Sequence, residues 1–123
     1  MANILVVDDV KIMRLTIRKH LESLGHTVVA DAENGYEAIQ QYKRFKPDLV
    51  TMDITMPEID GIGNGIDALE KIKEFDSDAK VIMLTSHGEQ KLVIKAISKG
   101  SKGYILKPVT KDKLSDVLEK ISL

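Results

Sequence analysis

Residues 4–9 read Ile4-Leu5-Val6-Val7-Asp8-Asp9, which is a run of four apolar residues followed directly by two acids. A continuous apolar run of this length is typical of a strand that is buried on both faces, as in a parallel sheet. A pair of carboxylates that follows such a strand lies at the carboxyl edge of the sheet, where open α/β folds bind their ligands. This stretch therefore indicates both the class of the fold and the place of a site.

The alternation that begins there continues along the chain. Short apolar and β-branched runs predict further strands at residues 27–30, 49–52, 81–84 and 104–106. After each strand, apolar residues recur at spacings of three and four, which predicts five amphipathic helices. Their apolar stripes are Met13, Ile17, Leu21, Leu24; Ala38, Ile39, Tyr42, Phe45; Ile66, Leu69, Ile72, Phe75; Leu92, Val93, Ala96, Ile97; and Leu114, Val117, Leu118, Ile121.

Residues at the ends of these stripes match the usual helix boundaries. Gly25 and Gly100 stand where C-terminal glycines belong, Pro47 ends the second helix, and Thr110 can N-cap the last one. Five strands in strict alternation with five helices predict an α/β fold, a parallel sheet with helices on both faces. We expect a single domain that spans residues 1–123, with no linker or effector domain in the sequence.

The composition excludes several classes of protein. Lys and Arg number 18 against 19 Asp and Glu, so the net charge is -1 and the basic excess of a nucleic-acid-binding domain is absent. The lack of cysteine excludes disulfides, thiolate metal sites and cysteine nucleophiles. No apolar run approaches the roughly 20 residues that span a bilayer, and the N-terminus lacks the features of a signal peptide. We therefore expect a cytoplasmic protein that binds neither nucleic acid nor membrane.

Polar residues stand at the ends of four predicted strands. They are Asp8, Asp9, Asp53, Thr85, Ser86 and Lys107. Because the carboxyl ends of parallel strands share one edge of a sheet, these side chains are expected to converge. Crowded carboxylates oppose one another's ionisation unless a cation is present, and Mg²⁺ prefers carboxylate and phosphate oxygens. An aspartate can also act as a nucleophile and form an aspartyl phosphate. The pattern predicts a Mg²⁺-assisted phosphoryl site, in which Lys107 and Thr85 bind phosphoryl oxygens.

Each of these residues alone has a simpler structural interpretation. The Asp8-Asp9 pair could form a turn, Asp53 could cap a helix, and Thr85-Ser86 could start the fourth helix. Lys107 could be a solvated surface lysine. The coincidence of all four features at strand ends on one edge favours the site.

The order and spacing of these motifs resemble the receiver domain of bacterial response regulators, most closely the single-domain regulators of chemotaxis. The resemblance rests on residues 4–9, on Met52-Asp53-Ile54-Thr55-Met56-Pro57-Glu58-Ile59-Asp60-Gly61, on Met83-Leu84-Thr85-Ser86 and on Tyr104-Ile105-Leu106-Lys107-Pro108. It covers essentially the whole chain. It implies a five-stranded, flavodoxin-like (βα)5 fold with strand order 2-1-3-4-5.

The resemblance also implies the chemistry of the site. Asp53 would accept a phosphoryl group from a histidine kinase, and Lys107 would contact that group. Asp9, Asp53 and the backbone carbonyl of Thr55 would bind Mg²⁺ directly, while Asp8 would reach the ion through water. The chain would assist its own phosphorylation and dephosphorylation without being a turnover enzyme.

A switch and its output follow from the same resemblance. Thr85 would move toward the phosphoryl group and Tyr104 would follow it, which changes the surface of the fourth helix, fifth strand and fifth helix. That surface would bind an output protein such as a flagellar motor switch protein, and the chain would be a monomer or a weak phosphorylation-linked dimer. Thr55 and His87 would set the lifetime of the phosphoryl group, and the bond between Lys107 and Pro108 would be cis.

The segment after Gly61 departs from the family pattern by about four residues. It reads Gly61-Ile62-Gly63-Asn64-Gly65-Ile66, and its glycines and Asn64-Gly65 favour positive φ and a turn. We interpret Ile62–Gly65 as a flexible loop. A changed mouth to the phosphoryl site, a new contact surface and a partial duplication are the alternatives.

Two other functions remain as alternatives. One is a receiver that belongs to a larger DNA-binding response regulator. The other is a Mg²⁺-dependent phosphohydrolase that forms an aspartyl phosphate, but such enzymes carry a second acid two residues after the nucleophile, where this chain has Thr55.

Overall fold

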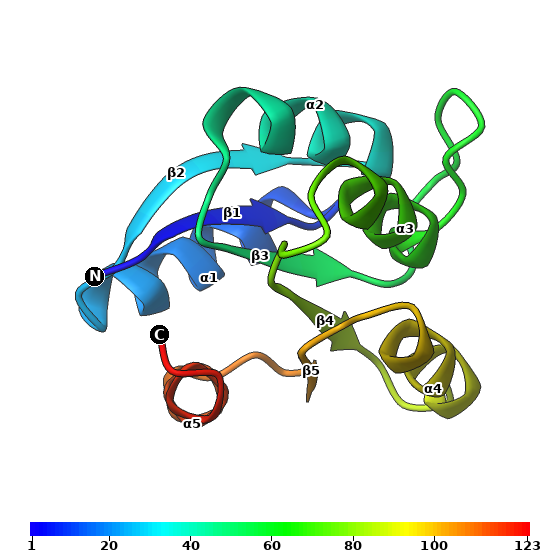
Figure 1. The fold of residues 1–123 in the computed structure, drawn as a ribbon. Coiled ribbons are helices and arrows are strands. Elements are labelled where there is room, and N and C mark those ends of the chain that lie inside the picture. Colours follow the sequence, from blue (N-terminus) through cyan, green and yellow to red (C-terminus); the bar gives the residue numbers. More distant parts are fainter.

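A computed structural model describes residues 1–123. Five parallel strands form one sheet in the order β2-β1-β3-β4-β5 (Figure 1). The strands are β1 (Asn3–Val7), β2 (Thr27–Ala32), β3 (Leu49–Asp53), β4 (Val81–Thr85) and β5 (Gly103–Leu106). The helices are α1 (Lys11–Ser23), α2 (Gly35–Phe45), α3 (Gly65–Phe75), α4 (Gln90–Ser98) and α5 (Lys111–Lys120). The predicted α/β fold and the strand order 2-1-3-4-5 are confirmed.

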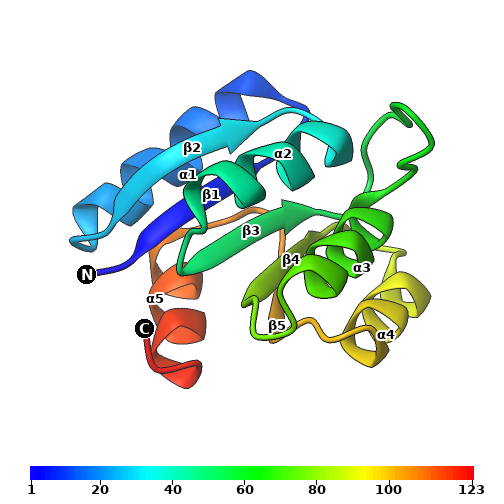
Figure 2. The same ribbon diagram turned by 45° about the horizontal axis from the view of Figure 1, so that its top comes forward.

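The helices cover both faces of the sheet because the chain reverses its direction across the sheet once. It moves from β1 out to β2, then back past β1 to β3, β4 and β5. Crossovers of one handedness place helices on opposite faces when the direction reverses. Accordingly α2, α3 and α4 lie on one face, and α1 and α5 lie on the other (Figure 2).

Each face has its own apolar core. One core joins Val50, Met52 and Met83 of the sheet to α2, α3 and α4, and the other joins Ile4 and Ile82 to α1 and α5. Every residue of β3 and β4 is buried, as the continuous apolar runs predict for central parallel strands. None of the helices combines the length and apolar character that crossing a bilayer requires.

The helix ends mostly agree with their sequence signals. The side chain of Thr110 accepts a hydrogen bond from Lys113 N–H and caps α5. Gly25 and Gly100 follow α1 and α4 with φ of +91° and +105°, a conformation that glycine adopts without strain. The peptide bond between Lys107 and Pro108 is cis.

The apolar stripes are shorter than the sequence predicts. Phe45, Phe75 and Ile97 are 41%, 46% and 51% exposed. Each of them lies in the last turn of its helix, beyond the part that packs on the sheet. Phe75 instead packs edge-on against Tyr42, with ring centroids 6.3 Å apart.

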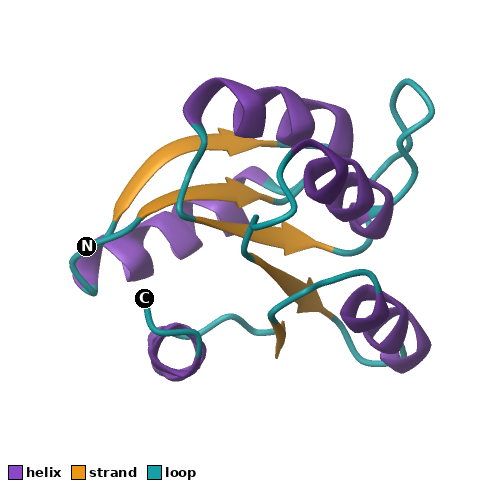
Figure 3. Cartoon of the chain, viewed as in Figure 1, coloured by secondary structure: helices purple, strands orange, loops and turns teal.

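The segment Ile62–Gly65, which the sequence predicts as a flexible loop, makes specific backbone and side-chain hydrogen bonds, and α3 already begins at Gly65. Ile59 and Ile62 form an antiparallel pair with two 3.0 Å hydrogen bonds, and Asp60 and Gly61 turn between them with positive φ. Asn64-Gly65 is not a positive-φ turn. Asn64 has an extended conformation and caps α3. The hairpin projects past the carboxyl ends of the strands (Figure 3).

Candidate functional site

Three carboxylates meet at the carboxyl edge of the sheet. Asp8 and Asp9 follow β1, and Asp53 is the last residue of the neighbouring strand β3. One oxygen from each carboxylate lies within 4.8 Å of the other two. Asp8 and Asp53 are buried and Asp9 is exposed, so the group opens to solvent on the Asp9 side.

Lys107 supplies the opposite charge. Its Nζ lies 3.1 Å from Asp53 Oδ1 and 3.3 Å from Asp8 Oδ2. The backbone N–H of Lys107 donates to the carbonyl of Thr85 at 2.7 Å, which continues the pairing of β5 with β4 and directs the lysine toward β3. Burial lowers the pKa of Lys107, but Asp53 and Asp8 outweigh it and raise the pKa above its ordinary value. The ammonium is therefore charged at neutral pH.

Asp53 ionises less readily than an ordinary aspartate. Its burial and the charge of Asp8 raise the pKa of Asp53 to about 7, although Lys107 opposes both effects. Three acids against one lysine leave a negative excess in a poorly solvated pocket. A divalent cation would remove that excess.

Asp8 is held in place by the start of α1. Its Oδ1 accepts from Val10 N–H at 2.9 Å. Arg14 donates from Nη1 to the Asp8 carbonyl at 2.7 Å and pairs through Nε with Asp31 at 3.4 Å. Sequence reasoning missed Arg14, because its partners are a backbone oxygen and a residue of a different strand. Arg14 thus holds the backbone at Asp8 and orients the two acids that follow β1.

Thr85 ends β4 beside the acids but points to a different partner. Its hydroxyl donates to Glu89 Oε1 at 3.0 Å, and Ser86 N–H donates to the same oxygen at 2.6 Å. The hydroxyl of Thr55 donates to Glu89 Oε2. Sequence reasoning assigned no role to Glu89, although Ser86-His87-Gly88-Glu89 has the S-x-x-E spacing of a capping box. Helix α4 begins after Glu89, so Thr85-Ser86 is not its N-cap.

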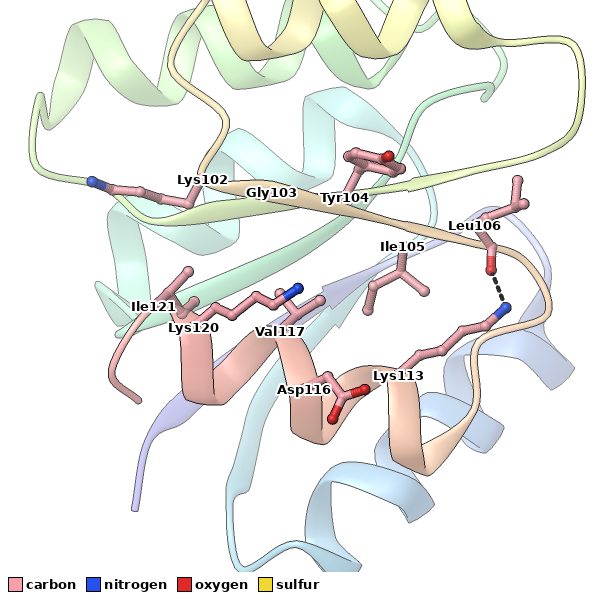
Figure 4. A pocket seen from close by; sticks show the side chains of 10 residues that line it. All are labelled: Lys102, Gly103, Tyr104, Ile105, Leu106, Lys113, Asp116, Val117, Lys120 and Ile121. Carbon is pink, nitrogen blue, oxygen red and sulfur yellow. Dashed lines mark hydrogen bonds between the residues drawn. The ribbon is translucent and has the colours of Figure 1, made fainter.

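The remaining predicted residues lie around a cavity of about 340 Å³ between α4 and β5. Thr85, His87 and Tyr104 line it together with Ile94 and Ile97. The ring of Tyr104 lies on the side of β5 away from α5 (Figure 4) and is half exposed. His87 is exposed at the mouth of the cavity.

The donor set is suitable for Mg²⁺. Asp8, Asp9 and Asp53 offer hard anionic oxygens at short mutual distances, and no softer nitrogen or sulfur ligand lies among them. The residual negative charge of the pocket favours a cation over an empty site. Asp53 also presents a carboxylate oxygen 3.1 Å from the ammonium of Lys107, an arrangement that is suitable for forming an acyl phosphate and stabilising its charge.

Comparison with known proteins agrees with this geometry. The model of the response regulator receiver domain matches residues 4–119. The chemotaxis protein CheY of Bacillus subtilis is 48% identical over 95% of this chain and 94% of its own length. CheY of Thermotoga maritima is 43% identical over 97% and 96%. A solved CheX-CheY-BeF3-Mg complex from Borrelia burgdorferi has a chain with a TM-score of 0.90 and 34% identity, covering 98% of this chain and 89% of that one.

Proposed function

The chain belongs to the response regulator receiver domain family, and we propose that it is a response regulator of chemotaxis whose switch is the phosphorylation of Asp53. Residues 1–123 would form one receiver domain. The observation that carries the proposal is the pairing of a buried, nucleophilic carboxylate with Lys107 at 3.1 Å inside a cluster of acids.

The covalent step is a transfer of a phosphoryl group to Asp53. A carboxylate oxygen of Asp53 forms a bond to phosphorus while the bond from phosphorus to the donor breaks. When the donor is a phosphohistidine, the P–N bond breaks and its electron pair stays on the imidazole nitrogen. When it is acetyl phosphate, the P–O bond breaks and acetate leaves. Lys107 stabilises the charge on the phosphoryl oxygens throughout.

Mg²⁺ would be held by Asp9, Asp53 and the backbone carbonyl of Thr55, with Asp8 acting through water. When bound, the ion would neutralise charge on the acids and on the phosphoryl oxygens. Lys107 then no longer has to balance three carboxylates alone, so its ammonium is free to follow the phosphoryl group. Asp8 keeps its hydrogen bond from Val10 N–H and continues to orient the lysine.

Phosphorylation would be transmitted through Thr85 and Tyr104. The new dianion offers acceptors to the Thr85 hydroxyl, and the shift of Thr85 leaves room in the cavity that Tyr104 lines. The face made by α4, β5 and α5 changes as a result. Its β5–α5 groove carries Lys102, Lys113 and Lys120 against a single acid, Asp116 (Figure 4), and this charge favours an acidic partner.

The partners follow from the family and its named relatives. A histidine kinase would supply the phosphoryl group, and a motor switch protein would bind the phosphorylated face. The Borrelia burgdorferi CheY was solved with CheX, BeF3 and Mg, so a CheX-like protein is a further candidate partner. We place the chain in the cytoplasm, as a monomer or a weak phosphorylation-linked dimer that binds no nucleic acid.

Two residues would set the lifetime of the phosphoryl group. Thr55 lies two positions after Asp53 and donates to Glu89, and His87 lies two positions after Thr85 and is exposed. In hydrolysis, water attacks phosphorus, the bond to Asp53 breaks, and inorganic phosphate leaves. Side chains at these two positions would block or orient that water.

The test is the intact mass of the chain after incubation with acetyl phosphate and Mg²⁺. We expect a gain of one phosphoryl group in the wild type and none in Asp53→Asn. Chelation of the cation should abolish the gain. A wild type that gains no mass, or an Asp53→Asn variant that gains as much, would remove the proposal.

A further inference from the structure

Glu89 gathers three hydrogen-bond donors on one carboxylate. Oε1 accepts from Thr85 Oγ1 at 3.0 Å and from Ser86 N–H at 2.6 Å, and Oε2 accepts from Thr55 Oγ1. The donors come from the end of β4, from the turn that follows it and from the segment after β3. The phosphoryl chemistry described above makes no use of Glu89, so this convergence needs its own explanation.

Three donors surround the carboxylate of Glu89. One is a backbone N–H and two are hydroxyls, so its ionised form is well hydrogen-bonded. Hydrogen bonds to an ionised acceptor are about twice as strong as neutral ones. The hydrogen bonds that Glu89 accepts are therefore strong in the unphosphorylated chain.

The hydrogen bond from Thr85 to Glu89 cannot coexist with the arrangement proposed for the phosphorylated chain. A hydroxyl carries one proton and donates to one acceptor at a time. In the proposed function Thr85 donates to a phosphoryl oxygen on Asp53, whose backbone pairs in register with Leu84, the residue before Thr85. Glu89 and the phosphoryl group thus compete for one donor, and as like charges they also repel one another.

We propose that Glu89 is a positioning residue that holds Thr85 in the unphosphorylated arrangement and is displaced from it when Asp53 is phosphorylated. This inference rests on the proposed function. Glu89 is also the residue that precedes α4, and its carbonyl accepts from Val93 N–H at 3.0 Å in the first turn. Its displacement would loosen the start of α4 and thereby connect the phosphoryl site to the face of α4 and β5.

The rate of phosphorylation tests the competition. Glu89→Ala removes all three acceptor contacts, and we expect it to be phosphorylated by acetyl phosphate and Mg²⁺ about tenfold faster than the wild type. Glu89→Gln keeps the length and one acceptor oxygen but not the charge, and is expected to fall between the two. Gln90→Ala changes the adjacent exposed residue and is the matched control, with an unchanged rate. A merely structural role of Glu89 would lower stability without raising this rate.

The amide proton of Ser86 gives a second readout that does not depend on the rate. A short hydrogen bond to a carboxylate shifts an amide proton downfield, so the Ser86 signal should lie downfield in the wild type and move upfield when Asp53 is phosphorylated. In Glu89→Ala, or in Glu89→Gln should the alanine variant fail to fold, it should lie upfield before phosphorylation. Equal rates in the Glu89 and Gln90 variants, or a Ser86 signal that phosphorylation does not move, overturn the inference. A wild type that gains no phosphoryl group overturns the proposed function instead.

Discussion

Asp53 ionises in the folded chain only at a cost in free energy. Its burial and the charge of Asp8 raise the pKa of Asp53 to about 7 against the opposing effect of Lys107. In the unfolded chain the carboxyl titrates near its ordinary value, so between about pH 4 and pH 7 the folded chain binds one more proton. The contribution of this group to stability is therefore complete in acid and is lost as the pH rises through 7.

Replacement of Asp53 by a neutral isostere should remove that pH dependence. We predict that Asp53→Asn raises the free energy of unfolding above pH 7 by an amount on the order of a few kcal/mol, and that the gain fades as the pH falls toward about 4. Urea denaturation over this range without divalent cations measures it. Asp116→Asn, which removes an exposed carboxylate from α5, is the control and should change little at either end of the range. A gain for Asp53→Asn that is equal at acid and alkaline pH would contradict this account.

Thr51 is a second buried polar residue with a measurable cost. It lies fully buried in β3, and its hydroxyl oxygen has no hydrogen-bond partner. A buried polar group without a partner costs roughly 1–3 kcal/mol, and valine has nearly the same shape. We predict that Thr51→Val raises the free energy of unfolding by about 1 kcal/mol, seen as a higher urea midpoint with an unchanged m-value. Thr27→Val, at an exposed position of β2, should change it little. A destabilised Thr51→Val variant would mean that the hydroxyl does have a partner.

At the residue scale, the sequence predicted the polar side chains at the strand ends. It missed the side chains that contact and orient them, Arg14 and Glu89. The position of Asp53 and Lys107 follows from apolar runs that stop at a polar residue. The roles of Arg14 and Glu89 depend on side chains that reach across elements, from α1 to the carbonyl of Asp8 and from the start of α4 to Thr55. Periodicity and local spacing do not encode these contacts between elements; the capping-box spacing marks only the shorter contact of Glu89 with Ser86.

The start of α3 is the element that most directly supports Asp53. Gly65 begins the helix, and its N–H donates to the Ile54 carbonyl at 2.7 Å. A Cβ at position 65 would overlap the carbonyl oxygen of Asp53 and lie 3.0 Å from Met52 Cγ. Only glycine lets α3 approach the end of β3 this closely.

A methyl group at that position should therefore disturb both stability and the site. We predict that Gly65→Ala lowers the free energy of unfolding by about 1–3 kcal/mol, because backbone has to move to relieve the overlap, and that it also slows phosphorylation of Asp53. Thermal denaturation and the intact-mass assay measure the two effects. Gly103→Ala is the matched control, since its Cβ would meet only Val117 at an ordinary 3.8 Å. Equal effects of the two substitutions would show that α3 can retreat from β3 without consequence.

The hairpin before α3 shows where local sequence signals compete. Asn64-Gly65 and Asp60-Gly61 are both turn dipeptides, and only the second turns, with positive φ at both residues. Asn64 is needed as the cap of α3, where it accepts from the N–H groups of Ile66 and Asp67. Ile62 also packs so closely on Gly35 that a Cβ there would lie 2.6 Å from Ile62 Cγ2. Both dipeptides favour a turn locally, and the contacts of Asn64 and Ile62 determine that Asp60-Gly61 forms it.

At the scale of the whole molecule, the fold class was predictable and the strand order was not. Strict alternation of apolar runs and amphipathic stripes requires a parallel sheet with helices on its faces. Nothing in that pattern says that β2 lies outside β1, and the order 2-1-3-4-5 came from the resemblance to a known family. The order matters because it makes β1 and β3 neighbours, which brings Asp8 and Asp9 beside Asp53.

That juxtaposition makes the stability of the whole chain sensitive to Mg²⁺. The three acids are together only in the folded chain, so a cation that binds them stabilises that state by mass action. Above its dissociation constant, each tenfold increase in Mg²⁺ should add about 1.4 kcal/mol, or roughly 5 °C in Tm for a chain of this size.

Substitution of Asp9, the exposed acid of the three, separates Mg²⁺ binding at this site from general effects of charge on stability. We predict that Asp9→Asn loses most of the Mg²⁺-dependent rise in Tm, because it removes one of the three donors on the exposed side of the cluster. Glu33→Gln removes an equally charged, exposed acid that follows β2 at the same edge of the sheet, outside the cluster, and should keep the full rise. Thermal denaturation across a Mg²⁺ series at constant ionic strength measures both. If Asp9→Asn and Glu33→Gln respond alike, the cation acts on the overall charge of the chain, and the acids at the ends of β1 and β3 do not form its site.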